Sequence, residues 1–371
     1  MTEFTDSFAI YANINPNPVL LPRPADSQVT LLTRYNAIGQ GNLAMGTQAS
    51  PSGSMALYLP FGAAIFKTFS HQAKYTLGFR LNMDCLAGVG GGSLIDFWNC
   101  HFGLTTLIVN TDGSILVLGS PSDTPVTICS NATPGLITAD VDCYVEFQCI
   151  CTDIGSDINV ACIVKIDNTV VASGNINIGV NKNRLVSGTA DFNGVTLNSG
   201  MSTNGRAYIW DLYLTNGSGA TNTGFLGSSI APYGITSQPI LPNSDSATIQ
   251  WTPLSGSVHF SEINELPGDL DTSYNGNTAA GNIDSLGWQP IPTFTGTVKS
   301  VQISLEQEST EEGTCIVKSN IGAAGAEEKG APFGLCSSYS YQHEAFDLDP
   351  ATGLAWLQTD FNVKLFGYEL T

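Results

Sequence analysis

The chain has 371 residues, of which 12% are charged and 42% hydrophobic, with 13 basic and 32 acidic side chains. This length predicts two or three domains, and the hydrophobic share is enough to build cores, which excludes a disordered chain. The net charge of −19 repels phosphate groups, so it argues against binding to nucleic acid or to an anionic membrane.

We expect neither a membrane-spanning segment nor a signal peptide. It has no run of about 18 or more apolar residues, which a membrane-spanning helix requires. Residues 1–6 lack the basic and apolar regions of a signal peptide. We therefore expect synthesis in the cytoplasm, with any later release depending on something else.

Alternating apolar and polar residues predict strands along the first part of the chain. Residues 75–83 are apolar at every odd position, which predicts a strand with one buried face and one face in water. Residues 107–109 and 115–118 flank an Asp-Gly turn and predict a hairpin. The same alternation predicts paired strands over 145–151 and 158–166.

The predicted fold class is all-β, with two antiparallel β-sandwich domains, because many short strands are separated by turns and no helical period appears. Residues 1–226 are expected to form a jelly roll that closes with a strand over 208–214. Residues 227–250 are rich in Gly, Ser and Pro and are expected to form a linker.

Residues 251–371 are expected to form a smaller and more acidic sandwich. Strands are predicted over 301–305, 314–318 and 363–370, with a helical turn over 356–362. From Pro232 onward the chain has 17 acidic and 4 basic residues, a net charge of −13, against −6 for the rest. Such a domain favours docking to a basic partner.

The nine cysteines favour buried thiols over a metal site or a secreted disulfide framework. The count is odd, and Cys149 and Cys151 are separated by one residue instead of the two typical of zinc sites. Cys149, Cys151 and Cys162 all fall on predicted core faces. A disulfide between Cys162 and either of the other two stays open and depends on the strand register.

The chain lacks the common patterns of a hydrolase, so no catalytic residue is assigned. It contains no Gly-x-Ser-x-Gly and no His-Glu-x-x-His sequence. His343 and Glu344 are interpreted as a surface or interface pair. A glycoside hydrolase needs two carboxylates held together. Glu146 stands alone in its strand, and the remaining acidic candidates lie in a proline-bounded stretch or a solvated loop: Glu262, Glu265, Glu308, Glu311 and Glu312.

No cofactor is predicted, although a bound calcium ion is left open. Asp269, Asp271 and Asp284 cluster loosely in sequence, but their spacing fits no EF-hand loop. Calcium sites of β-sandwiches can draw on loops far apart in sequence, so no ligand residue is named.

Four tryptophans are candidates for sugar platforms, namely Trp98, Trp251, Trp288 and Trp356. Carbohydrate recognition uses exposed aromatic rings, whereas a tryptophan beside a strand more often packs in a core or an interface. The sequence does not separate the two interpretations, and the ligand-binding residues stay unknown.

Several segments, in order, resemble phage and prophage structural proteins with an N-terminal LamG/concanavalin-like jelly roll. The longest is the predicted closing strand and exit loop at 208–227, YIWDLYLTNGSGATNTGFLG, where Trp210 replaces the first of two Asp residues usual in the family. Residues 349–356, DPATGLAW, resemble its C-terminal Asp-Pro-x-Thr-Gly-x-x-Trp signature. Shorter matches are FTDSF at 4–8, LPN at 241–243, QWTP at 250–253 and DTSY at 271–274.

The resemblance implies a virion component, either a tail or fibre element or a capsid-decorating protein, and implies no reaction. Its partners would be other virion proteins and further copies of the same chain, with a trimer as one arrangement. It leaves head or tail, copy number and host undecided. The alternative hypothesis is a carbohydrate-binding adhesin that uses the jelly roll to recognise a host-surface glycan, and a glycoside hydrolase ranks third.

Overall fold

The computed structural model divides the chain into two compact units, mainly residues 14–237 and 238–371. It describes residues 2–6, 37–38, 44–46, 56–60, 64–84, 86, 92–99, 102–119, 125–155, 157–177, 191–198, 206–227, 239–265, 272–291, 293, 296–309, 316–323, 326–334 and 340–371. The described strands pair antiparallel throughout, which confirms the predicted all-β class. No described helix is long and apolar enough to cross a membrane.

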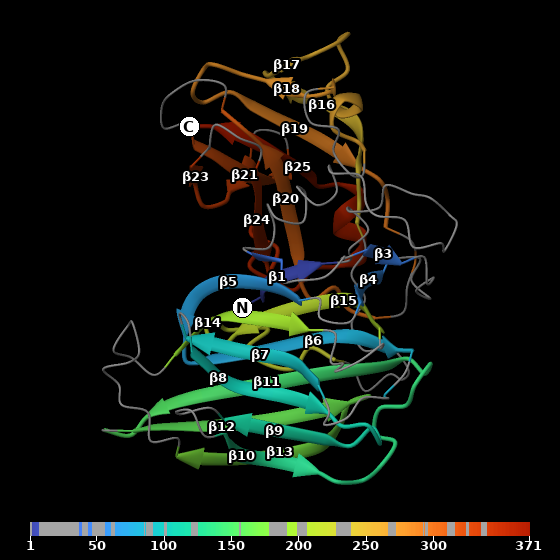
Figure 1. Cartoon of the computed structure of the whole chain (residues 1–371). Helices are drawn as coiled ribbons and strands as arrows, with labels where there is room; N and C mark the ends of the chain where they lie inside the picture. Colours follow the sequence, from blue (N-terminus) through green and yellow to red (C-terminus); the bar gives the residue numbers. More distant parts are fainter. Residues whose placement is uncertain are drawn as a thin grey trace. The chain divides into compact units, whose positions relative to one another are not determined.

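Two antiparallel sheets form the first unit and lie in two layers (Figure 1). Sheet A runs in the spatial order β13 (Thr169–Asn177), β12 (Ile158–Ile166), β11 (Cys143–Asp153), β6 (Lys74–Met83), β15 (Arg206–Asn216), β4 (Ala56–Pro60) and β3 (Ala44–Gly46), with β1 (Thr2–Asp6) pairing with β15. Sheet B runs β10 (Val126–Asn131), β9 (Ile115–Gly119), β8 (Phe102–Val109), β7 (Gly92–Asn99), β14 (Phe192–Asn198), β5 (Ala64–Gln72) and β2 (Ala37–Ile38).

The core of this sandwich is built by the alternating positions that the sequence marks as apolar. Phe97 of sheet B packs against Phe147 of sheet A with ring centroids 5.6 Å apart, and against Phe192 at the same distance. Thr105 of β8 lies 3.3 Å from the Cys149 sulfur of β11. Because the residues between these positions point the other way, each sheet also has an outer face.

The predicted hairpin at 107–118 and the strand pair at 145–166 are confirmed in register. Leu107 lies opposite Val117, and Gly113 takes the positive φ of 79° that the turn requires. Val145 lies opposite Ile166, and the pairing runs without a shift to Asp153 and Ile158.

The described part of the second unit comprises one larger sheet, two short strand pairs and the 3-10 turns η3 and η5. The sheet runs β16 (Pro242–Ile249), β19 (Ile283–Trp288), β25 (Leu365–Leu370), β21 (Ile316–Ala323) and β22 (Ala326–Lys329), and β23 (Phe333–Gly334) pairs with β21. The strand pairs are β17 (Thr252–Pro253) with β18 (Asn275–Gly276), and β20 (Val301–Gln307) with β24 (Ser340–Phe346). The turns are η3 (Phe260–Glu262) and η5 (Gln358–Asn362).

Strand β16 corrects the predicted linker. Residues 242–249 fall within the segment expected to connect the domains, yet they pair with β19 in the sheet of the second unit. The pairing is irregular, with register shifts between Pro242 and Ser244 and between Asp245 and Ile249. These shifts break the alternation of side chains, which explains why the sequence shows no strand pattern there.

Candidate functional site

A half-buried polar cluster occupies the middle of the outer face of sheet B. Asp96 of β7 lies opposite Thr196 of β14 on one side and Thr106 of β8 on the other. The Asn198 Nδ2 donates to the Asp96 Oδ2 at 2.7 Å and to the Ser93 Oγ at 3.1 Å. Since Ile95 and Phe97 point into the core, the strand places Asp96 outward.

Phe66 of β5 extends this face beyond Thr196, its opposite residue. A Cβ at Gly194 would come within 2.9 Å of the Phe66 ring, so the glycine leaves room for the ring to lie on the sheet. Phe66 and the polar residues of the cluster are all half-buried, which leaves part of each side chain open to solvent. We name this surface the Asp96 face, and it consists of Phe66, Ser93, Asp96, Thr106, Thr196 and Asn198.

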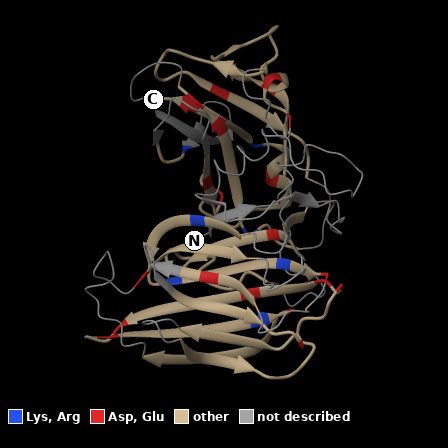
Figure 2. Ribbon diagram, viewed as in Figure 1, with Lys and Arg blue, Asp and Glu red and all other residues tan. Residues whose placement is uncertain are grey.

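The Asp96 carboxylate has neutral hydrogen-bond partners. Burial raises the pKa of Asp96 above its ordinary value, while hydrogen bonds from Thr106, Asn198 and Ser93 act in the opposite direction. Charged side chains are sparse on the strands of the first unit in general (Figure 2). The site therefore offers one carboxylate among hydroxyl and amide groups.

A second carboxylate is buried on the outer face of sheet A. Glu146 of β11 and Tyr213 of β15 both lie opposite Gly78 of the intervening strand β6. The Tyr213 hydroxyl donates to the Glu146 Oε1, which also accepts from the Gly227 N at 2.8 Å. The Tyr213 oxygen accepts from the Leu226 N at 3.0 Å. The hydrogen bonds from Leu226 and Gly227 thus attach the exit loop to sheet A.

This arrangement corrects the expectation that strand 75–83 has one face in water. Thr76 and Arg80, on its outer face, are 0% and 1% exposed. The Gln148 Nε2 donates to the Thr76 Oγ1 at 2.9 Å, and Arg80 forms an ion pair with Asp211 at 3.8 Å. These polar residues therefore lie against one another in the interior instead of contacting water.

Trp210 and Asp211 lie at an irregularity of β15. The register with β6 shifts between Trp210 and Tyr213, and Asp211 has a positive φ of 49°. The ring of Trp210, which is 1% exposed, stacks on Tyr208. The residue that departs from the family pattern is thus part of a packed bulge.

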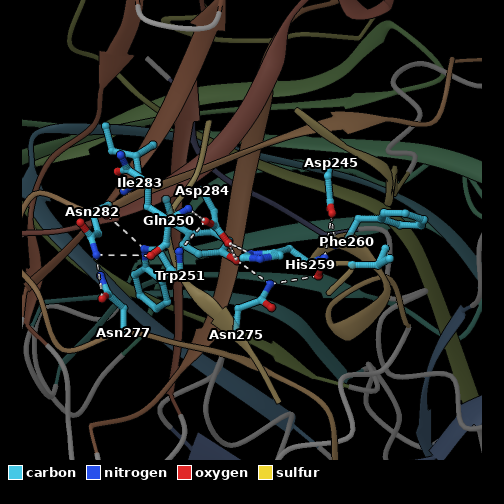
Figure 3. Close-up of polar contacts among 12 residues, drawn as sticks. Asp245, Gln250, Trp251, His259, Phe260, Asn275, Asn277, Asn282, Ile283 and Asp284 are labelled. Atoms are coloured by element: carbon cyan, nitrogen blue, oxygen red, sulfur yellow. Dashed lines mark hydrogen bonds and ion pairs between the residues drawn. The ribbon is translucent and has the colours of Figure 1, made fainter. Parts of the chain in front are cut away.

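A buried polar network in the second unit joins β16, β19, β25 and η3 (Figure 3). The His259 Nδ1 lies 2.7 Å from the Asp284 Oδ2, which also accepts from the Tyr368 hydroxyl at 3.2 Å. The Asp284 Oδ1 accepts from the Gln250 N at 2.7 Å and the Trp251 N at 2.8 Å. Burial, with Asp284 nearby, raises the pKa of Tyr368 well above its ordinary value, so its hydroxyl stays a donor.

The same network ends in a cap on η3. The Asp245 carboxylate accepts from the His259 N at 3.0 Å and from the Phe260 N at 2.7 Å. The Asn275 Nδ2 joins the Tyr368 hydroxyl to the His259 carbonyl oxygen. A histidine held by a carboxylate is an arrangement found in catalytic and metal sites. Here its described contacts fasten strands together, so we assign it a structural role.

Those acidic candidates whose side chains the structure describes have separate partners. Glu262 is buried beside Ser255, Glu265 accepts from Ser273, and the Glu344 carboxylate accepts from the Ala331 N. Glu308 is half-buried. Glu311, Glu312, Asp269 and Asp271 lie outside the described residues.

Asp284, the remaining calcium candidate, is the acceptor of the network above. Among the described residues no group of three or more His, Cys, Asp or Glu side chains is placed to hold a metal ion. The prediction of no cofactor is thus untested, and no calcium ligand is named.

The described tryptophans named as sugar platforms pack against the clusters of the second unit, where Trp356 is buried and Trp251 and Trp288 are half-buried. The Trp251 Nε1 donates to the Asn282 carbonyl oxygen, and its ring meets Tyr368 edge-on. Trp288 packs in the same manner on Phe366, and Trp356 is 3% exposed. The side chain of Trp98 lies outside the described part.

The segment 349–356 forms a turn that is tied to the residues on either side of it. The Asp349 carboxylate accepts from the Ala351 N and the Thr352 hydroxyl and forms an ion pair with Lys364 at 2.8 Å. Gly353 has a positive φ of 68°, and the Trp356 Nε1 donates to the Phe346 carbonyl oxygen. Four of the five fixed residues of this segment, Asp349, Thr352, Gly353 and Trp356, thus have a structural role.

The buried-thiol prediction is confirmed for the five cysteines that the structure describes. Cys129, Cys143, Cys149, Cys151 and Cys162 are free and buried. The other four, at 85, 100, 315 and 336, lie outside the described residues.

Sequence reasoning did not identify the Asp96 face. The alternation of Ile95 and Phe97 around Asp96 is a signal that the carboxylate points outward. Its partner Asn198, however, lies 102 residues further along the chain. Only the sheet order brings the two together.

No family model and no curated protein matches the chain. Among solved structures, the binding domain of botulinum neurotoxin DC in complex with rat synaptotagmin II is 9% identical, with 89% of this chain and 93% of that one covered and a TM-score of 0.33. The lectin I-B4 from Griffonia simplicifolia is 9% identical over 48% and 93%, with a TM-score of 0.32. Domain 4 of the arabinanase AbnA from Geobacillus stearothermophilus, in complex with arabinotriose, is 12% identical over 47% and 75%, with a TM-score of 0.31. Likeness at this level does not bear on function.

Proposed function

We propose that the Asp96 face binds an uncharged carbohydrate and that the protein is a binding protein without catalysis. The observation that carries this proposal is the half-buried Asp96 carboxylate, held among hydroxyl and amide groups on the outer face of sheet B. Sugar hydroxyls donate and accept hydrogen bonds, which the carboxylate, amide and hydroxyl groups here complement. Phe66 adds an apolar surface for the C–H face of a sugar ring.

The charge of the site and of the chain favours an uncharged ligand. The Asp96 face contains no Lys or Arg, so nothing in it pairs with a uronate, sulfate or sialate group. The net charge of −19 adds a general repulsion of anionic glycans.

The carboxylates support binding over hydrolysis. Glycoside hydrolases commonly place two carboxyl groups about 5–9.5 Å apart on either side of the bond they cleave. The Asp96 face has one carboxylate, and the Glu146 carboxylate belongs to sheet A, where Tyr213 and Gly227 hold it.

A glycan array probed with the full chain tests this proposal. We expect binding to one or more uncharged glycans and a fall in affinity of about tenfold or more in both Asp96→Ala and Asn198→Ala, which is the loss of about 1.4 kcal/mol. Ser130→Ala, an exposed change on the edge strand β10, is the matched control and should bind as the parent does. Absence of binding to every uncharged glycan would overturn the function. Undiminished binding by both variants would overturn the location.

We retain a second proposal, that the protein is a component of a phage particle. Its support is the ordered resemblance of segments from 4–8 to 349–356 to phage structural proteins. The two proposals are compatible, because an adhesin carried on a particle needs a glycan-binding face. Immunogold labelling of phage particles from a lysate of cells that express the protein tests this second proposal. Label confined to the particle-free fraction would refute it.

A further inference from the structure

Two thiols face each other across neighbouring strands in the core of the first unit. Cys149 of β11 lies directly opposite Cys162 of β12. Their sulfurs are 3.5 Å apart, and the residues are 0% and 1% exposed. Directly opposite residues in antiparallel strands have Cα atoms about 4.5–5.5 Å apart. That spacing lies within the range of about 4.4–6.8 Å that a disulfide spans.

The register separates the two partners that the sequence leaves open for Cys162. Cys151 lies opposite Val160, so it is diagonal to Cys162. Diagonal positions have Cα atoms about 7–8 Å apart, and beyond about 7 Å a disulfide requires backbone movement. Of the two, only Cys149 is placed for a bond.

A competing partner comes from the edge of sheet B. Cys129 lies beside Gly174, and Gly174 is the residue opposite Cys162 on β13.

The Thr105 hydroxyl contacts the Cys149 sulfur at 3.3 Å and can donate to it in either redox state. Oxidation of Cys149 therefore leaves no new unsatisfied donor at this position.

We propose that Cys149 and Cys162 form a cross-strand disulfide when the chain folds in the presence of a small-molecule disulfide. In the first exchange, the thiolate of one cysteine attacks a sulfur of oxidised glutathione, forms a mixed disulfide and releases one reduced glutathione. In the second exchange, the thiolate of the other cysteine attacks the protein sulfur of this mixed disulfide and releases a second reduced glutathione. The two cysteines lose two electrons and two protons, and one oxidised glutathione becomes two reduced molecules.

The exchange belongs to folding, before β11 and β12 close. Once folded, both sulfurs are shielded from solvent. Burial, together with the hydrogen bond to Cys149, also raises the pKa of Cys162 well above its ordinary value, which suppresses the reactive thiolate. Folding without an oxidant should accordingly give the free thiols, which later exposure to oxidised glutathione leaves unchanged.

The test is to refold the denatured full chain with a mixture of oxidised and reduced glutathione, alkylate free thiols and digest with a protease that cleaves before Asp. Cleavage at Asp142, Asp153, Asp157 and Asp167 gives the peptides 142–152 and 157–166. We expect the two peptides to be joined, with a mass about 2 Da below their sum and with fragmentation that assigns the link to Cys149. The oxidised chain should also unfold at a higher denaturant concentration than the reduced chain.

Three variants serve as controls. Cys151→Ala and Cys129→Ala should keep the joined peptides, whereas Cys149→Ala should lose them. A link from Cys162 to Cys129 or Cys151, or alkylation of both Cys149 and Cys162 after oxidative refolding, would overturn the proposal. Because the peptide analysis is made on the parent chain without substitutions, it decides the question even if a variant fails to fold.

Discussion

A missing side chain creates the buried contact on sheet A. The Tyr213 ring crosses Gly78 to reach Glu146 on the far side of β6, and a Cβ at Gly78 would lie 2.2 Å from the Tyr213 Cε1. Burial, with Tyr144 and Glu146 nearby, raises the pKa of Tyr213 well above its ordinary value. The hydroxyl therefore stays protonated and keeps donating to the carboxylate.

Removal of this hydroxyl is expected to destabilise the first unit. Tyr213→Phe leaves the Leu226 N–H without its acceptor and takes one of two hydrogen-bond donors from the Glu146 Oε1, at a cost of about 2 kcal/mol in the free energy of unfolding. Denaturant unfolding of the full chain measures the change. Tyr274→Phe, at a residue that is 40% exposed, should change it by less than about 0.5 kcal/mol. Equal effects of the two substitutions would contradict this role of Tyr213.

Asp349 gives the second unit a defined response to pH. Burial acts to raise its pKa, but hydrogen bonds from Lys364, Thr352 and the Ala351 N, with the charge of Lys364, outweigh it and lower the pKa. A lowered pKa in the folded state means that the ionised carboxylate stabilises the fold above the unfolded pKa of about 3.9. That contribution is lost as the pH falls through the folded pKa.

We therefore expect Asp349→Asn to lower the free energy of unfolding by about 2 kcal/mol near neutral pH. The difference from the parent should shrink as the pH falls below about 4. Denaturant unfolding across a pH series measures it. A difference that stays constant down to the most acidic pH would show that the ion pair with Lys364 is not its cause.

At the scale of elements, the close approach of β19 and β25 depends on a glycine. A Cβ at Gly367 would lie 1.9 Å from the Asp284 carbonyl oxygen, and a backbone atom cannot swing aside as a side chain can. Gly367→Ala should therefore push the central strands of the sheet apart, at a cost of about 3 kcal/mol.

Thermal and denaturant unfolding of Gly367→Ala measure this cost. Gly276→Ala is the matched control, since its Cβ would meet the Tyr274 ring at 3.5 Å, an ordinary contact. A Gly367→Ala protein as stable as the control would refute the steric account.

The elements that could be predicted from the sequence are those with a regular register. The strands at 75–83 and 145–166 pair without shifts between β11 and its neighbours, so the period of two survives in the sequence. The helical turn expected within 356–362 is confirmed as η5, beside the buried Trp356. Alternation within one strand is sufficient for such elements.

What could not be predicted depends on neighbours far along the chain. β16 loses its alternation to two register shifts and acquires its place from β19. Burial of the outer face of β6 depends on Gln148, 72 residues beyond Thr76, and on the exit loop that follows β15. The residues of a single strand do not indicate which distant residues will cover its outer face.

The candidate site illustrates the same limit at the scale of the molecule. Trp251, Trp288 and Trp356 pack against the clusters of the second unit, while the polar residues proposed to bind are a carboxylate, an amide and hydroxyls on three strands of sheet B. The strand order β8-β7-β14 assembles them. In a chain with a net charge of −19 the resulting face is suited to a neutral ligand, so its affinity should change little with ionic strength.

The most direct test of the central claim is to map the binding face in the full chain. Backbone amide resonances would be followed by NMR while the best uncharged glycan from the array is added, with Ser130→Ala and Asp96→Ala in parallel. The account predicts shifts concentrated at Asp96, Thr106, Thr196 and Asn198, unchanged in Ser130→Ala and abolished in Asp96→Ala. Shifts confined to sheet A or to the second unit, or shifts that persist in Asp96→Ala, would contradict it.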